Sequence, residues 1–428
     1  MEKRFETQVI NDEILEKLNL DHRYDYLNEN LSPILTESQF AFLKEVQGFC
    51  LKFEEDNNIT HGPNEDIYDW YPTFGNQGYI TRQYSYKSID LNYKEHGMAM
   101  DFMRILALDF FDPQFTMGSG ATVICINPIQ EHHDNIPIRL EALKELVTGK
   151  TPGCLLITEP ERGSDAVHML TTCEEQGDGS FILNGTKIFN TNAPRSKWAI
   201  AYATAEKNNG NLMGQFLINT SWDGWSCERV GIPWVSKLYI GKEKLENLKV
   251  PKEYVLAGIG KGRVHLFEGL VPERISIAVR GVSECWGALA YAIIYANMRR
   301  QFEKEILLFQ GVGFTLTDLW AKTTALTHGI LKFCEMYDEK MLKYEGKLPE
   351  NISRALVALG SQYKYNCASL SKKVCYETAN LMGGAGLCDN TLMQDYVNIS
   401  RIQEIIGGSR QIQQFIMSRN LRNQFKNL

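Results

Sequence analysis

The spacing of apolar residues changes twice along this chain of 428 residues, and that change limits its fold more than any other feature. Residues 32–60 and 86–150 carry apolar side chains at helical intervals. Short β-rich runs follow from 153 to about 256, and helical spacing returns in long segments from 264 onward. This order predicts an α+β multidomain chain in which two helical domains flank a small β-barrel or sandwich.

We expect three domains, with boundaries at these changes of periodicity. Within the middle domain, Gly177-Asp178-Gly179 predicts a β-hairpin. The segment GIGKG at 258–262 predicts a turn from strand to helix, because it lacks the GxxxxGK[ST] spacing of a phosphate loop. The expected domains are a helical domain over 1–150, a β domain over 151–265 and a helical bundle over 266–428, whose long helices are predicted at 271–303, 312–345, 352–382 and 409–426.

Composition and charge argue against several classes of function. The net charge is −7 and the Lys and Arg residues are scattered, which disfavours a nucleic-acid platform. No apolar run approaches the roughly 18 residues needed to cross a bilayer. The N-terminus has no secretory or transit pattern, and the ten cysteines form no CxxC pair, so we expect reduced thiols in a cytoplasmic protein. His132 and His133 lie in a polar segment without ligand spacing, so we expect surface histidines and no metal site.

The segment at 157–165, ITEPERGSD, is a candidate phosphate-binding loop. Pro160 removes a backbone donor and ends the preceding strand, while Gly163 supplies the freedom that a tight turn needs. Successive N–H groups in such a turn, with the hydroxyl of Ser164, can bind an anion. The alternative is an ordinary β-turn capped by Ser164 or Asp165.

This loop is part of a wider resemblance. Residues 153–192, reading GCLLITEPERGSD and then LNGTKIFNTNAP, resemble the paired flavin-binding signatures of the acyl-CoA dehydrogenase family. Four further pieces resemble that family in the same order: LVPERISIA at 270–278, RRQFEKEILLFQ at 299–310, NLMGGAG at 380–386 and IIGGSRQIQ at 405–413. The resemblance implies the family's fold, with an N-terminal helical domain, a middle β domain and a C-terminal four-helix bundle. It also implies FAD as cofactor, an electron acceptor such as an electron-transfer flavoprotein, and a homotetramer or at least a homodimer.

The resemblance also suggests the catalytic base. Most members carry a glutamate before the glycine of a segment resembling IYEGTSQIQ, and here that position holds Gly407, which cannot remove a proton. The isovaleryl and long-chain branches place the base in a segment resembling LxxERLxxA, and LVPERISIA has Glu273 at the matching place. Pro272 suits a first helical position and would put Glu273 in the first turn, where acidic residues are also common for capping alone.

The resemblance also implies roles for two residues near the proposed base. The backbone N–H of Gly407 matches a donor to the thioester oxygen, and a backbone donor survives the loss of a side chain. Arg274 matches an arginine that supports the catalytic loop, although it could also be a solvated charge in a first turn.

The cofactor contacts match the family unevenly. Phe189 stands where tryptophan is usual, and a phenyl ring can still cover a flavin face. Asn190 replaces an apolar neighbour without an explanation in the sequence, and Glu303 replaces a glycine. Ser409 is also a plausible N-cap for the last helix. The residues that match FAD contacts are Leu155, Ile157, Thr158, Gly163, Ser164, Phe189, Thr191, Arg299, Phe302, Gln310, Asn380, Gly384, Ser409 and Gln411.

These observations predict FAD-dependent α,β-dehydrogenation of an acyl-CoA thioester, as in fatty acid metabolism. The reaction needs a base against the α-carbon while hydride leaves the β-carbon for flavin N5. Three alternatives stay open: the same desaturation on an acyl or aminoacyl thioester of a carrier protein, an oxidase that uses O₂, and a flavin-binding relative without dehydrogenase activity. The last is suggested by VNISR at 397–401, which replaces residues resembling LMRDAK.

Overall fold

The computed structural model describes residues 10–62, 65–81, 87–91, 96–388 and 390–424. The chain forms two compact units that interleave along the sequence. The helical unit contains residues 1–65, 97–116 and 274–428, and the sheet unit contains residues 66–96 and 117–273.

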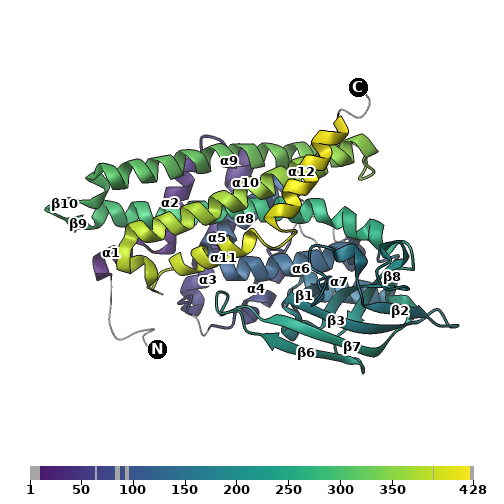
Figure 1. The fold of residues 1–428 in the computed structure, drawn as a ribbon. Coiled ribbons are helices and arrows are strands. Elements are labelled where there is room, and N and C mark those ends of the chain that lie inside the picture. Colours follow the sequence, from purple (N-terminus) through teal and green to yellow (C-terminus); the bar gives the residue numbers. More distant parts are fainter. Residues whose placement is uncertain (1–9, 63–64, 82–86, 92–95, 389, 425–428) are drawn as a thin grey trace. The chain divides into compact units, whose positions relative to one another are not determined.

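The sheet unit contains the strands that the sequence predicts between 153 and about 256. The eight strands form one sheet in the order β6-β7-β3-β2-β4-β5-β8, and β1 pairs in parallel with β4. Figure 1 labels β6, β7, β3 and β2 of this sheet. The predicted hairpin at Gly177-Asp178-Gly179 joins the antiparallel strands β2 and β3. The strands are β1 (Gly153–Leu156), β2 (Thr172–Glu175), β3 (Phe181–Thr191), β4 (Trp198–Thr204), β5 (Met213–Asn219), β6 (Trp225–Val230), β7 (Ile240–Val250) and β8 (Val255–Ala257).

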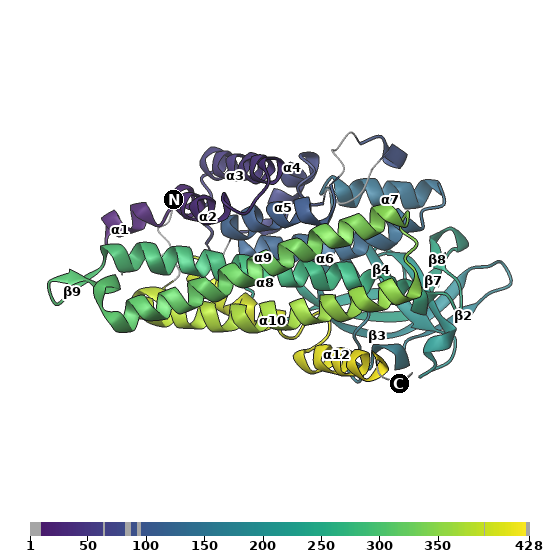
Figure 2. The ribbon, with the colours of Figure 1, turned by 90° about the horizontal axis from the view of Figure 1, so that it is seen from above.

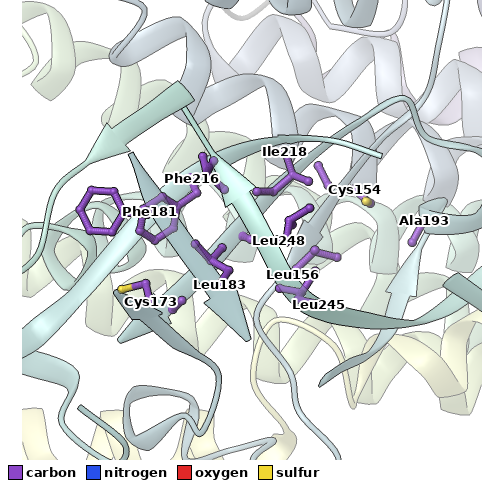
Figure 3. Packing of buried hydrophobic residues seen from close by; sticks show 14 residues of the cluster. Cys154, Leu156, Cys173, Phe181, Leu183, Ala193, Phe216, Ile218, Leu245 and Leu248 are labelled. Carbon is purple, nitrogen blue, oxygen red and sulfur yellow. The ribbon is translucent and has the colours of Figure 1, made fainter. Parts of the chain in front are cut away.

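Apolar side chains from several strands of the sheet pack in a buried core. Phe181 and Leu183 of β3 pack with Phe216 of β5 and Leu248 of β7, all at most 3% exposed (Figure 3). The β4 residues in this core are alanines, and such small side chains let the strands on either side approach. Two further helices of the sheet unit are α4 (Tyr71–Asn76) and α7 (Pro137–Val147), and α6 (Pro113–Glu131) begins in the helical unit.

Long helices dominate the helical unit. Figures 1 and 2 show α8, α9 and α10 running side by side. The predictions for α9, α10 and α12 agree with the structure to within a few residues, whereas α1, α2 and α11 were not predicted. The helices of this unit are α1 (Asp12–Lys17), α2 (Leu20–Leu31), α3 (Glu37–Asn57), α5 (Met98–Phe111), α8 (Gly262–Met298, shared with the sheet unit), α9 (Gln310–Lys343), α10 (Glu350–Met382), α11 (Met393–Gln403) and α12 (Arg410–Gln424).

The predicted start of α8 is wrong. The helix begins at Gly262, the last residue of the turn expected at 258–262, and Pro272 lies inside it. A proline removes one intrahelical hydrogen bond without always ending a helix, and here the apolar residues before it continue the helix. Glu273 is therefore far from the first turn, where the helix dipole would favour its charge.

The predicted end of α8 also needs correction. The helix ends at Met298, and β9 (Arg300–Gln301) and β10 (Lys304–Glu305) form a tight hairpin instead of a helical face. The two turn residues, Phe302 and Glu303, have φ of +50° and +67°. Two left-handed residues are what a type I′ turn requires, which explains why glycine is the expected residue at position 303.

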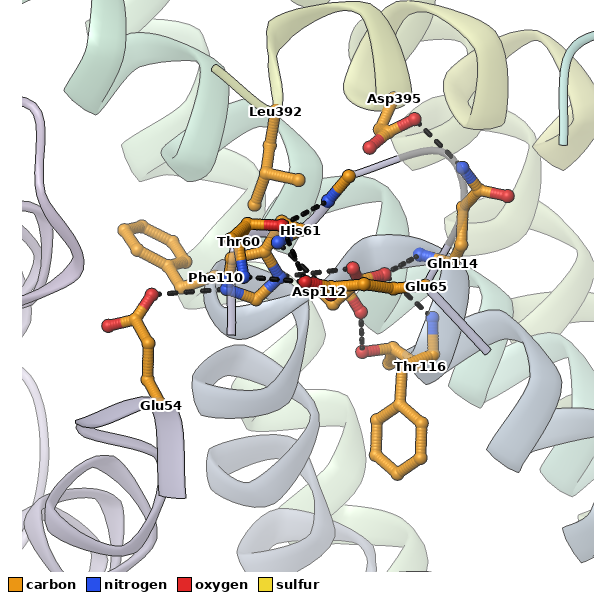
Figure 4. Close-up of polar contacts among 12 residues, drawn as sticks. Glu54, Thr60, His61, Glu65, Phe110, Asp112, Gln114, Thr116, Leu392 and Asp395 are labelled. Atoms are coloured by element: carbon orange, nitrogen blue, oxygen red, sulfur yellow. Dashed lines mark hydrogen bonds and ion pairs between the residues drawn. The ribbon is translucent and has the colours of Figure 1, made fainter. Parts of the chain in front are cut away.

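A polar cluster closes the start of α6 in the helical unit (Figure 4). The Oδ1 of Asp112 accepts hydrogen bonds from the N–H groups of Gln114 and Phe115, both at 2.9 Å, and so caps the helix. The ring of His61 lies between two carboxylates, with Nδ1 3.2 Å from Asp112 and Nε2 3.1 Å from Glu54. The segment before α6 is thereby fixed to the end of α3.

One helix exceeds the sequence expectation for apolar length. An 18-residue stretch of α8 has a mean hydropathy of 1.3, which by length and composition would suffice to cross a membrane. This stretch is 89% buried within the protein, as in the core helix of a globular unit.

Candidate functional site

The base of the loop at 157–165 is fixed by a buried ion pair. The Nζ of Lys187 on β3 lies 2.9 Å from the carboxylate of Glu159 and donates to the carbonyl of Ile157 at 3.0 Å. Glu159 also accepts from the N–H groups of Leu170 and Thr171 at 2.6 and 2.9 Å. Burial alone would raise the pKa of Glu159, but Lys187 and these donors outweigh burial and lower it. The loop thus leaves β1 in a defined direction.

The tip of the loop is exposed. The N–H of Arg162 donates to the carbonyl of Glu159 at 3.1 Å, so the tight turn runs over 159–162 with Pro160 at its second position. Gly163 does not adopt a positive φ, so the expectation that it makes the turn is wrong. Ser164 is exposed, and its hydroxyl makes no hydrogen bond to another described residue. The tip is therefore free to contact a ligand.

The end of β3 lies beside this loop. The N–H of Ile188 donates to the carbonyl of Thr158 at 2.9 Å. The next residue, Phe189, interrupts the pairing with β7, has φ of +62° and is 58% exposed, while Thr191 is half-buried. The structure thus brings together the two sequence segments that resemble flavin signatures, and it presents an aromatic ring beside them.

The structure explains Asn190, which the sequence left without an interpretation. Its side-chain amide donates to the carboxylate of Glu243 on β7, and both residues are buried. The thiol of Cys227 lies 3.6 Å from the other oxygen of Glu243. Burial raises the pKa of Glu243 to about 7. The Asn190 side chain thus supplies a hydrogen bond to the buried carboxyl group of Glu243. The sequence alone did not reveal this pair.

A narrow pocket of about 30 Å³ in the sheet unit contains the proposed base. Glu273, on α8, lines it together with Leu155 and Ile157 at the end of β1. Glu131, at the end of α6, also lines the pocket, and its side chain is 46% exposed. The candidate base and two predicted flavin contacts therefore face one cavity.

The other two predicted catalytic residues belong to the helical unit. Arg274 is only 5% exposed, so the alternative of a solvated charge is wrong. Gly407 lies before α12 with φ of +59°, and its N–H donates to none of the described residues. The hydroxyl of Ser409 accepts from the N–H of Ile412 at 3.4 Å, as expected of an N-cap, and Gln411 is exposed.

A second pocket, in the helical unit, gathers predicted FAD contacts. Arg299, Phe302 and Gly384 line this pocket. Phe302, at the hairpin turn, is 88% exposed. Gln310 begins α9 and Asn380 is near the end of α10, and each adjoins a residue that lines the pocket.

Comparison with known proteins identifies the family. A family model described as "Acyl-CoA dehydrogenase, C-terminal domain" matches residues 260–422, and one described as "Acyl-CoA dehydrogenase, middle domain" matches residues 154–233. Together they match more than half of the chain. The chain belongs to the acyl-CoA dehydrogenase family.

Similar proteins agree with this assignment. The chain is 28% identical over 281 residues to the caffeyl-CoA reductase-Etf complex subunit CarC of Acetobacterium woodii, covering 64% of this chain and 70% of that protein. It is 23% identical over 419 residues to the mitochondrial isovaleryl-CoA dehydrogenase of Arabidopsis thaliana, covering 93% and 95%. The butyryl-CoA dehydrogenase of Megasphaera elsdenii has the same fold, with a TM-score of 0.78 at 24% identity over 91% and 99% of the two chains.

Proposed function

We propose that this member of the acyl-CoA dehydrogenase family carries out FAD-dependent α,β-dehydrogenation of an acyl-CoA thioester, with Glu273 as the base. The observation that carries the proposal is the pocket that Glu273 shares with Leu155 and Ile157. A carboxylate in the same cavity as the predicted flavin contacts fits a reaction in which a proton and a hydride leave adjacent carbons.

The residues present fit FAD. Near the end of β1 and the end of β3, the exposed loop tip and the ring of Phe189 offer a polar and an aromatic contact side by side. In the helical unit, Arg299 and Gly384 line one pocket. The positive charge of Arg299 suits a diphosphate, and the uncovered backbone of Gly384 leaves room for a group such as adenosine. When bound, FAD accepts the hydride from the β-carbon at N5.

The chain's own residues supply the proton transfer and the charge stabilisation. Glu273 takes the α-proton onto a carboxylate oxygen, which needs the ionised form of its side chain. In the helical unit, the N–H of Gly407 donates to none of the described residues, and the family resemblance assigns it as a donor to the thioester oxygen. Apolar side chains such as Leu155 and Ile157 limit water beside the base.

Anaerobic titration of the yellow protein with acyl-CoA thioesters tests the proposal. We expect loss of the flavin absorbance near 450 nm with at least one chain length, and loss of this bleaching in Glu273→Gln. Glu174→Gln, which changes an exposed carboxylate on β2, is the matched control and should bleach like the wild type. Near-normal bleaching of Glu273→Gln would show that another group is the base, and a protein that takes up no FAD would refute the proposal as a whole.

We also propose an electron-transfer flavoprotein as acceptor, an assembly of two or four copies, and a cytoplasmic location. The acceptor is supported by the similar subunit from Acetobacterium woodii, whose name places it in a complex with Etf. The highly exposed Phe302 in a pocket of predicted FAD contacts supports an assembly, because a second copy could complete such a site. Light scattering tests the assembly, acceptor reduction assays test the acceptor, and cell fractionation tests the location.

A further inference from the structure

Two histidines and a glutamate form a cluster in the sheet unit that the proposed reaction does not use. His132 follows the last residue of α6, and His265 and Glu268 stand three residues apart on α8, so they share a face of that helix. The rings of His132 and His265 stack with centroids 3.7 Å apart and an interplanar angle of 7°. His132 is thus a partly exposed histidine whose ring stacks on that of His265.

The hydrogen bonds around His265 leave one ring nitrogen available. The Nδ1 of His265 lies 2.9 Å from the amide oxygen of Gln215 and donates to it. The amide nitrogen of Gln215 donates to the hydroxyl of Tyr202 at 2.6 Å, which fixes the orientation of the amide. With its proton on Nδ1, His265 presents the lone pair of Nε2, in the manner of a metal ligand held by an outer partner.

The other members of the cluster also present acceptors. The Nε2 of His132 is shielded from solvent and makes no hydrogen bond to the described residues. One atom each of His132, His265 and Glu268 lie within 4.8 Å of one another. Neutral imidazole is the form that binds metals.

We propose that His132, His265 and Glu268 form a binding site for one divalent transition-metal ion of the Zn²⁺ type. Two imidazole nitrogens and one carboxylate oxygen are a common ligand set for this ion, with a fourth position for water. Ligands about 2.1 Å from a tetrahedral ion lie about 3.4 Å apart, so the cluster has to contract by up to about 1.4 Å and one ring has to turn. His132 has room to turn, because its side chain is 26% exposed and lies beyond the end of α6.

The site would place an ion in the pocket that contains Glu273. His132 and His265 both line that pocket, and Glu131 lies beside them with its Oε2 3.9 Å from the Nε2 of His132. The binding of the ion does not depend on the proposed dehydrogenation.

Metal binding by the purified full-length protein tests this proposal directly. The protein, freed of metal with a chelator, is dialysed against micromolar Zn²⁺ in the presence of millimolar Mg²⁺, and bound metal is measured by elemental analysis. We expect one Zn²⁺ per chain, with affinity at least tenfold weaker in His265→Ala and in Glu268→Gln. Glu268 is exposed, so its variant is expected to fold even if the loss of a partly buried histidine disturbs the chain.

His133→Ala is the matched control, because His133 follows His132 in sequence but does not belong to the cluster. It should bind Zn²⁺ like the wild type, and circular dichroism should report the same fold for all variants. The proposal is overturned if the wild type shows no saturable Zn²⁺ binding, if Mg²⁺ displaces the ion, or if His133→Ala loses as much affinity as Glu268→Gln.

Discussion

The Nζ of Lys187 lies 2.9 Å from the carboxylate of Glu159, and the two side chains are 0% and 2% exposed. This buried pair joins β3 to the loop that follows β1. Since Ile157 also accepts from Lys187 at 3.0 Å, a single ammonium group holds two residues of the predicted flavin loop.

Replacing Lys187 with Met should destabilise the protein by about 3–5 kcal/mol, because Glu159 would remain buried without its cation. The loop should also lose its fixed exit from β1, so the affinity for FAD should fall. Urea unfolding measures the first effect, and titration of the flavin-free protein measures the second. Lys242→Met, at an exposed position of β7, should leave both quantities unchanged. Wild-type stability in Lys187→Met would mean that the pair does not fix the loop.

Glu243 should make stability depend on pH. Burial raises its pKa to about 7 in the folded state, whereas an unfolded glutamate titrates near 4.5. Between these values the folded state binds more protons than the unfolded state, so the contribution of Glu243 to stability falls as pH rises from about 4.5 to 7.

Glu243→Gln removes this titration and keeps an amide oxygen for the Asn190 side chain. The free energy of unfolding of the variant minus that of the wild type should be about 1–3 kcal/mol larger at pH 8 than at pH 5. Urea unfolding at both pH values measures the difference. Glu246→Gln, on the exposed face of the same strand, is the control and should show no such change. If the free energies of unfolding of Glu243→Gln and the wild type differ by the same amount at pH 5 and pH 8, the pKa of Glu243 is not raised.

The sequence predicted the succession of elements because hydrophobic periodicity and turn residues act locally. It did not predict the partners of Asn190 and Lys187, since Glu243 and Glu159 are 53 and 28 residues away along the chain. A lone lysine in a strand is typical of a solvated face, and only the fold shows that Lys187 is buried. Such pairs depend on strand register and loop path, which local patterns do not specify.

Local rules also failed where tertiary packing overrode them. Pro272 indicates a helix start by its usual preference, yet α8 continues through it because the apolar residues on both sides pack in the interior. Phe302 and Glu303 are unusual residues for a tight hairpin, so the sequence suggested a helix there instead. Glu273 lines one pocket with Leu155 and Ile157, and its role as the base stays a prediction.

Asp112 should contribute separately as a helix cap and as the partner of His61. Asp112→Asn keeps an oxygen for the N–H groups of Gln114 and Phe115 but loses the negative charge beside the imidazole. Asp112→Ala loses both, so it should be less stable than Asp112→Asn by about 1–2 kcal/mol, the usual worth of an N-cap. Thermal or urea unfolding of the two variants measures this difference, and equal stabilities would show that the cap contributes little.

Phe189 should separate cofactor binding from folding. Its φ of +62° is strained for a phenylalanine, and its ring is 58% exposed, so the side chain adds little to the core. Phe189→Gly should leave the stability of the flavin-free protein unchanged or raise it by up to about 1 kcal/mol, since glycine adopts this backbone freely. The same change should weaken FAD binding about tenfold by removing an aromatic contact, whereas Phe189→Trp should keep the affinity. Flavin titration and urea unfolding measure the two effects independently, and full FAD affinity in Phe189→Gly would mean that the ring does not cover the flavin.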